Sequence, residues 1–163
     1  MFAEFHGLPI HALVIHAAVV FAPLAAVLGF GLFLPRWRMA VRWPLVALAA
    51  LAFATVSVAV TSGRVLRRAL GDQLTGKDNP AGKLVEHHKV LGERLWWVLL
   101  AYLLVVIAVA LMLPRLVNPH AAQAVAALVA VIAVVAIVLV AQTGEAGSKA
   151  RWNPDGSFDY SGD

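Results

Sequence analysis

Histidine is the side chain whose type and spacing in this sequence point most clearly to chemistry. Two pairs stand near the ends of long apolar segments: His11 with His16, and His87 with His88. The chain has no cysteine, which excludes disulfides, thiolate zinc sites and iron–sulfur clusters within it. Neutral imidazole is a ligand for iron, copper and zinc. These residues therefore predict a site for a histidine-ligated metal ion or heme.

Helical spacing indicates which member of the second pair faces inward. Leu84, His88, Leu91 and Leu95 are separated by four, three and four residues, so they form one stripe along a helix. His88 is therefore expected to point with the leucines toward the interior. His87 lies at the flank of the same stripe.

The first pair cannot share one centre. His11 and His16 are five residues apart, so on a helix they point about 140° away from each other. Only one of them is expected to face a centre shared with His88. The spacing leaves open which one.

A histidine from each of two helices, inside an apolar bundle, suits the iron of a b-type heme. Trp96, together with the apolar positions around it, offers a wall for a porphyrin. Arg64, Arg67 and Arg68 follow the second apolar segment and could hold the heme propionates through bidentate hydrogen bonds. We expect these residues to bind the cofactor.

Copper or zinc is an alternative to heme, because imidazole binds both metals. The three methionines do not lie near the histidines in the sequence, so a methionine-rich copper path is absent. Zinc needs a third or fourth ligand, for which Glu86 or Glu145 could serve. Ordinary packing, with the imidazoles hydrogen-bonded to backbone or water, is a further alternative.

The elements that position these residues are membrane spans. Of the 163 residues, 61% are hydrophobic and 13% are charged, against roughly 45–50% and 25% in soluble domains. A soluble domain of this size cannot bury that much apolar surface. A membrane-spanning helix needs about 20 mostly apolar residues. Four segments meet this requirement: 10–34, 44–61, 95–113 and 120–141.

The sequence predicts an all-α integral membrane protein, a four-helix transmembrane antiparallel bundle in the lipid bilayer. The helical pattern of the second and third spans continues beyond the membrane, with a turn at 71–79 and a third helix over 80–113. We therefore expect an extramembrane helical hairpin between helices 2 and 3. Residues 1–143 are expected to form the four-span domain, and 144–163 a polar tail with little regular structure.

The basic residues are expected to orient the protein in the membrane rather than to bind nucleic acid. The net charge is only +4, and basic residues of membrane proteins flank the spans and fix their orientation. The end with the termini holds most of the lysines and arginines, whereas the two short loops hold a dense, acid-free group: Arg36, Arg38, Arg42 and Arg115. By total number of basic residues, the end with the termini would face the cytoplasm, whereas by the acid-free arginines the two short loops would face it. The dense group favours exoplasmic termini in a bacterial cytoplasmic membrane.

The ends of the chain carry a family resemblance. Gly-Leu-Pro-Ile-His at 7–11 with Val-Ile-His at 14–16 resembles the opening of an uncharacterised bacterial family of four-span membrane domains. That family also has a histidine near the start of its third span, which His88 or His87 matches. Gly-Glu-Ala-Gly at 144–147, followed by Ala-Arg-Trp at 150–152, resembles the family's Gly-His-Ser-Gly…Trp ending.

The chain departs from that pattern at three positions. Ala12 and Ala18 stand where the family usually has proline, and Glu145 stands where it often has histidine. Some relatives are fused to Rieske-type or cytochrome-c-type domains. The resemblance therefore implies redox-protein partners or a larger membrane complex.

The expected function is a membrane-embedded, cytochrome-like electron-transfer protein or subunit with heme b. The competing class is a non-redox membrane anchor or assembly subunit of a larger complex. A small transporter is disfavoured, because the half of the spans away from the histidines offers no polar path across the membrane.

Overall fold

The computed structural model describes residues 4–6, 8–71 and 79–159. Gly7 and most of the predicted turn at 71–79 lie outside these ranges. The elements in chain order are β1 (Glu4–Phe5), β2 (Leu8–Pro9), α1 (Ile10–Gly29), η1 (Phe30–Phe33), α2 (Pro35–Leu70), α3 (Pro80–Met112), η3 (Leu113–Arg115) and α4 (Pro119–Trp152). The two short strands pair in antiparallel fashion just before α1.

Proline and asparagine define where the long helices begin. Pro35, Pro80 and Pro119 are the first residues of α2, α3 and α4, where a missing N–H costs nothing. Asn79 and Asn118 cap the last two of these helices. The side-chain oxygen of Asn79 accepts a hydrogen bond from the Ala81 amide at 3.0 Å. This cap lies where the helix expected over 80–113 begins.

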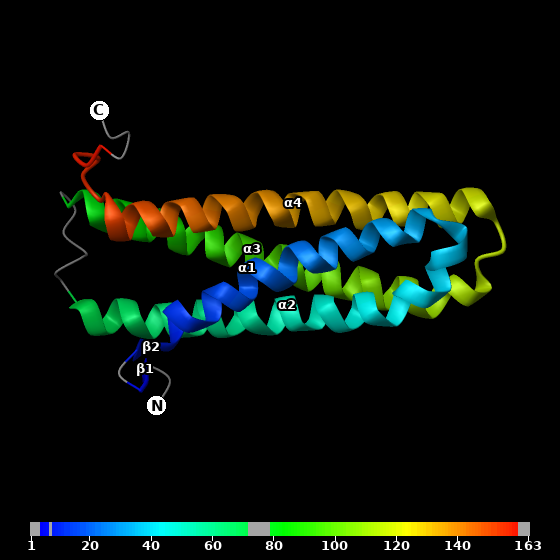
Figure 1. Ribbon diagram of the computed structural model, residues 1–163, viewed down its shortest axis with the longest axis horizontal. Helices are drawn as coiled ribbons and strands as arrows, with labels where there is room; N and C mark the ends of the chain where they lie inside the picture. Colours follow the sequence, from blue (N-terminus) through cyan, green and yellow to red (C-terminus); the bar gives the residue numbers. More distant parts are fainter. Residues whose placement is uncertain (1–3, 7, 72–78, 160–163) are drawn as a thin grey trace.

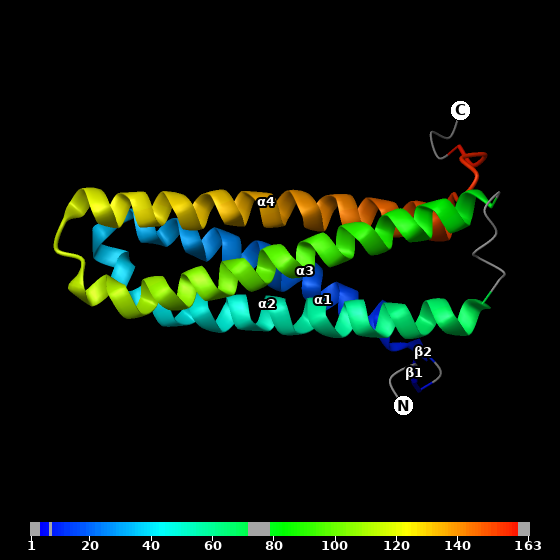
Figure 2. The same ribbon diagram turned by 180° about the vertical axis from the view of Figure 1, so that it is seen from behind.

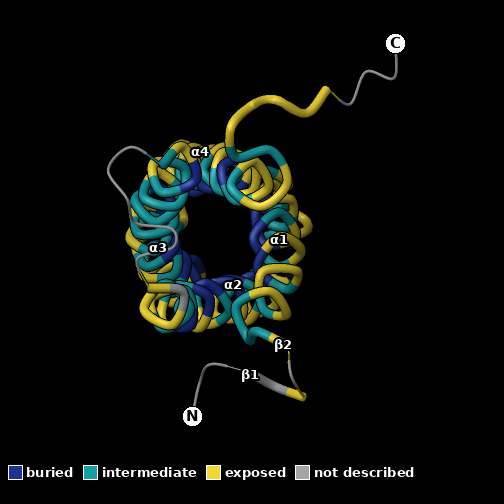
Figure 3. Tube along the Cα trace, turned by 90° about the vertical axis from the view of Figure 1, so that its left-hand side faces the viewer, coloured by how far each residue is buried: buried dark blue, intermediate teal, exposed yellow. Residues whose placement is uncertain are grey.

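The four long helices lie side by side, and the chain reverses its direction along the long axis after each one (Figures 1 and 2). Both α1 and α3 contact α2 and α4. Seen along the axis, the helices form a ring whose buried residues face inward (Figure 3). We call the end with β1, β2 and Trp152 the terminal end, and the end with η1 and η3 the loop end.

All four helices are long and apolar enough to cross a membrane. Large apolar side chains also cover the outside of the helices: Val27 is 65% exposed and Val131 is 63% exposed. Such an apolar exterior is unsuited to water and matches hydrocarbon. The protein is therefore a multi-pass membrane protein.

Small side chains fill the interior between the helices. Ala25, Ala49, Ala52 and Ala126 are completely buried. Small residues at membrane helix interfaces let backbones approach closely. Tyr102 is the largest of the fully buried side chains, and its hydroxyl donates to the carbonyl oxygen of Ala25 at 3.0 Å.

Two helices are longer than the sequence suggests. Residues 35–43, expected as a loop, belong to α2, because Val41 and Leu45 share one buried stripe of a helix that continues through Pro44. The expectation of little regular structure from 144 onward is wrong for residues 144–152, which extend α4. In that stretch Ala146 is buried, and Glu145 pairs with Lys149 one turn later at 2.6 Å.

Candidate functional site

His11 lies in the first turn of α1 and bridges to α2. Its Nδ1 lies 2.8 Å from the carbonyl oxygen of Ala59. Because a carbonyl oxygen can only accept a hydrogen bond, the proton must be on Nδ1. In the neutral ring this leaves Nε2 with a free lone pair, available to a metal.

His88 repeats this arrangement on the other side of the bundle. It lies two turns inside α3, and its Nδ1 donates to the carbonyl oxygen of Thr143 on α4 at 2.9 Å. The buried residues Leu91 and Leu95 follow on the same stripe, as the spacing predicts. Each histidine thus joins two helices and has its tautomer fixed by a backbone carbonyl.

The two imidazole rings lie next to each other. The ring centres of His11 and His88 are 5.9 Å apart, and the ring planes are nearly perpendicular at 85°. Two imidazole nitrogens at roughly 2.0 Å each from the same ion lie about 4 Å apart when they bind it from opposite sides. The ring centres are then somewhat farther apart, which agrees with the observed separation.

A glycine stands against each ring. A Cβ atom at Gly63 of α2 would lie 3.1 Å from Cε1 and Nδ1 of His11. A Cβ atom at Gly147 of α4 would lie 3.0 Å from the same two atoms of His88. Contacts this short require the ring to give by a few tenths of an ångström, so the two glycines leave the imidazoles the room in which they sit.

The other two histidine candidates lie elsewhere. His16 is exposed, and its Nδ1 bonds the carbonyl oxygen of Ala12 in its own helix at 2.9 Å. His87 is exposed on α3. Of the two histidines in the first pair, the structure brings His11 to His88.

Two of the three arginines expected to bind heme propionates form ion pairs between α2 and α3. Arg64 pairs with Glu93 at 3.1 Å, and Arg67 pairs with Glu86 at 2.7 Å. Arg68 is exposed. Exposed ion pairs of this kind contribute at most about 1 kcal/mol to stability. They connect the two helices at the same end of the bundle as the histidines.

Trp96 packs between α2 and α3. Its indole N–H donates to the hydroxyl of Ser57 at 2.8 Å, and its ring centre lies 5.3 Å from that of Phe53. The indole is half-buried. It lies about two turns after His88 along α3, farther from the terminal end.

The carboxylates suggested as zinc ligands are paired with cations. Glu86 also contacts Lys89 at 3.0 Å, and Glu145 contacts Lys149 at 2.6 Å. Among residues 4–6, 8–71 and 79–159, no group of three or more histidine, aspartate or glutamate side chains is arranged to hold a metal ion. The donor set at the site is a pair of imidazoles.

Sequence reasoning missed four parts of this site. The carbonyl oxygens of Ala59 and Thr143 carry no sequence signal, since every residue has one. Gly63 and Gly147 were visible, but a glycine inside a helix has several explanations. The informative feature was their placement in polar stretches at the ends of the second and fourth spans.

Comparison with known proteins places the chain in a family. The family model described as "Predicted membrane protein (DUF2231)" matches residues 7–156. The chain belongs to this family. The matched region contains all four long helices and both histidines of the pair. No curated protein and no solved structure matches the chain. The DUF2231 description names a membrane protein and no activity.

Proposed function

We propose that the protein binds one b-type heme between His11 and His88 and acts as an electron-transfer protein or subunit in a bacterial cytoplasmic membrane. The observation that carries this proposal is the pair of adjacent imidazoles, each with Nδ1 hydrogen-bonded to a backbone carbonyl oxygen. Metal-ligating histidines almost always donate their other ring N–H in this way, which fixes the ring and makes the free nitrogen a better ligand.

The number of donors favours heme over zinc. A structural zinc ion needs four ligands and a catalytic one three from the protein, whereas the described residues bring two imidazoles together. Heme iron needs only its two axial ligands from the chain. A heme held here would supply one-electron redox chemistry. The residues of the chain would bind the iron, orient the rings and keep water away through Leu91 and Leu95.

A single copper ion is the second candidate. It is favoured because the ring centres are only 5.9 Å apart and a single ion between them would not require room for a macrocycle. Imidazole is a good copper ligand, but methionine, which would favour Cu(I), is not part of the site.

The position of the histidine pair indicates at which end of the bundle a redox partner would bind. Both histidines lie at the terminal end, close to the ion pairs between α2 and α3. In the proposed arrangement the four helices form an antiparallel transmembrane bundle, and the ends of α2 and α3 form a hairpin outside the membrane. A redox partner, or a larger membrane complex, would then exchange electrons at this end.

Cofactor analysis tests the proposal. Protein purified in detergent should contain iron and extractable protoheme in equal amounts, with one of each per chain. Stoichiometric copper without heme would show that the site binds a copper ion rather than heme. Protein with neither cofactor, after expression with added heme precursor and copper, would favour a non-redox membrane anchor.

The propionate role of the arginines stays a prediction. We expect that Arg→Gln at position 64, 67 or 68 lowers heme occupancy or shifts the midpoint potential in at least one variant. The substitution removes a positive charge, and charges near the heme iron affect its midpoint potential. Redox titration of the three variants measures this. Unchanged occupancy and potential in all three would assign these residues to ion pairing and membrane anchoring alone.

Orientation gives a further prediction. If the terminal end is exoplasmic, alkaline phosphatase fused after residue 163 should be active in a bacterial host, since that enzyme needs the oxidising periplasm. A fluorescent protein that matures in the cytoplasm serves as the control at the same position. Fluorescence with an inactive phosphatase would reverse the orientation.

A further inference from the structure

The loop end carries four guanidinium groups and no carboxylate. Three are on α2 and one is in η3: Arg36, Arg38, Arg42 and Arg115. The sequence has no acidic residue between Glu4 and Asp72, or between Glu93 and Glu145. The chain therefore supplies no counter-charge here. At a membrane surface, anionic lipid headgroups are the counter-charge for such basic residues.

One of these arginines is incompletely satisfied. The Nε of Arg42 is buried, and within the described part of the chain it has no hydrogen-bond partner. Its guanidinium carbon lies 5.7 Å from the ring centre of Trp43, and Nη1 lies 4.0 Å from the sulfur of Met39. Because this Nε is closed off from the surface, a group from outside the chain would reach the guanidinium through its terminal nitrogens, whose charge no carboxylate at this end neutralises.

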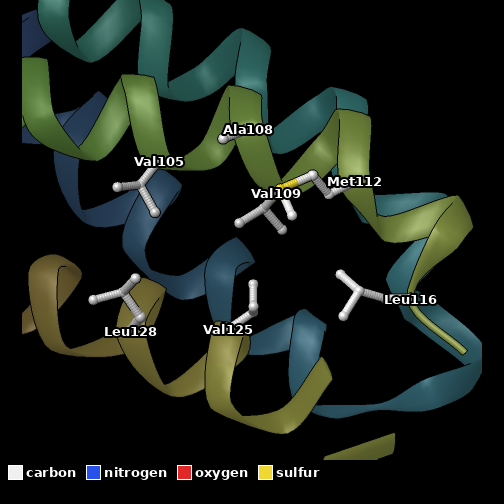
Figure 4. A pocket seen from close by; sticks show the side chains of 7 residues that line it. All are labelled: Val105, Ala108, Val109, Met112, Leu116, Val125 and Leu128. Carbon is white, nitrogen blue, oxygen red and sulfur yellow. The ribbon is translucent and has the colours of Figure 1, made fainter. Parts of the chain in front are cut away.

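An apolar cavity lies at the same end, between α3 and α4. Figure 4 shows the side chains that line it: Val105, Ala108, Val109, Met112, Leu116, Val125 and Leu128. Its volume is about 190 Å³, and no polar surface lines it. An apolar cavity of about 150 Å³ can bind benzene. The cavity is thus large enough for a segment of one hydrocarbon chain.

The charges and the cavity adjoin each other. Arg115 lies between Met112 and Leu116 in the sequence, and both of these line the cavity. One guanidinium nitrogen of Arg115 donates to the carbonyl oxygen of Leu111 at 3.1 Å, which holds its charge beside the end of α3. The first residues of α2, which carry the other three arginines, lie at the same end of the bundle as η3 (Figure 1), and α2 contacts η3.

We propose that the loop end is a binding site for an anionic phospholipid. One acyl chain occupies the cavity between α3 and α4, and the headgroup phosphate pairs with Arg42 and Arg115. A small anion would use the charges and leave the cavity dry. A neutral lipid would fill the cavity and leave the charges without a partner. A phospholipid with a net negative headgroup satisfies both.

Native mass spectrometry of the purified full-length protein tests this site. We expect phosphatidylglycerol to be retained in preference to phosphatidylcholine. The double variant Arg42→Gln, Arg115→Gln should lose that preference by at least about tenfold, since one basic residue near a membrane surface contributes about fivefold in affinity. Leu128→Trp should weaken binding of both lipids by filling the cavity.

Matched controls separate this site from general charge and surface effects. Arg94→Gln removes an exposed arginine at the terminal end, and Leu104→Trp enlarges a side chain that is 58% exposed and does not line the cavity. Both should retain phosphatidylglycerol like the unchanged protein. Circular dichroism and gel filtration verify that each variant is folded.

Three results would overturn the proposal. The first is equal retention of the two lipids by the unchanged protein. The second is a loss in Arg94→Gln as large as that in the double variant, which would indicate non-specific attraction. The third is a co-purifying polypeptide, rather than a lipid, that Leu128→Trp displaces. None of these results depends on whether heme is bound between the histidines.

Discussion

Replacing His88 by alanine should lower the heme content of the purified protein at least tenfold. The substitution removes one of the two histidines proposed to hold the heme iron, together with the hydrogen bond that joins α3 to the carbonyl oxygen of Thr143 at 2.9 Å. Changes to groups that merely support a metal ligand already cost about 10–100-fold in affinity. Loss of the ligand itself should cost at least as much. Heme extraction and quantification per chain measures the effect.

Two histidines serve as controls for this substitution. His87 is the exposed neighbour of His88, and His120 is exposed at the loop end, at the start of α4. Alanine at either position should leave heme content unchanged. If His88→Ala keeps its heme and His87→Ala loses it, α3 presents the other histidine and the ligand assignment is wrong.

Replacing Gly147 by alanine should have the second-largest effect. The new Cβ atom would lie 3.0 Å from two ring atoms of His88, so the imidazole or α4 has to give by a few tenths of an ångström. Overpacking of this kind costs about 1–3 kcal/mol in stability. Because a misplaced ring cannot bind iron from the same position, heme occupancy should fall as well. Thermal unfolding and heme content of the variant measure both effects.

Gly144 provides a closely matched control three residues earlier on the same helix. A Cβ atom there would have nothing within 4 Å, and the position is exposed. Alanine is the better helix former, so Gly144→Ala should stabilise the protein by about 0.5–1 kcal/mol and leave heme content unchanged. Equal behaviour of the two alanine variants would show that the close approach to His88 has no consequence.

Much of the fold could be predicted from the sequence, because hydrophobic length and helix-start residues are local signals. The apolar segments mark four membrane spans, and Asn79 with Pro80 marks where α3 begins. The start of α2 could not be predicted, because Arg36, Arg38 and Arg42 make 35–43 look like a polar loop. Burial of Val41 in the core keeps that segment helical, and burial depends on neighbouring helices.

The site was predictable only in part. Spacing placed His88 on the inward stripe and restricted the first pair to one inward histidine. It could not choose between His11 and His16, because that choice depends on the rotation of α1 against α2. The bond from His11 to the carbonyl oxygen of Ala59 fixes that rotation in the structure. The sequence could not show that Arg64 and Arg67 pair with Glu93 and Glu86, because that pairing depends on how α2 and α3 align.

In the proposed function, His11 and His88 hold a heme iron between them. Its most direct test is the absorption spectrum of the purified protein before and after reduction with dithionite. We expect a sharp α-band in the reduced protein, and no such band in the double variant His11→Ala, His88→Ala. A reduced protein without that band, or a band that persists in the folded double variant, would contradict the claim.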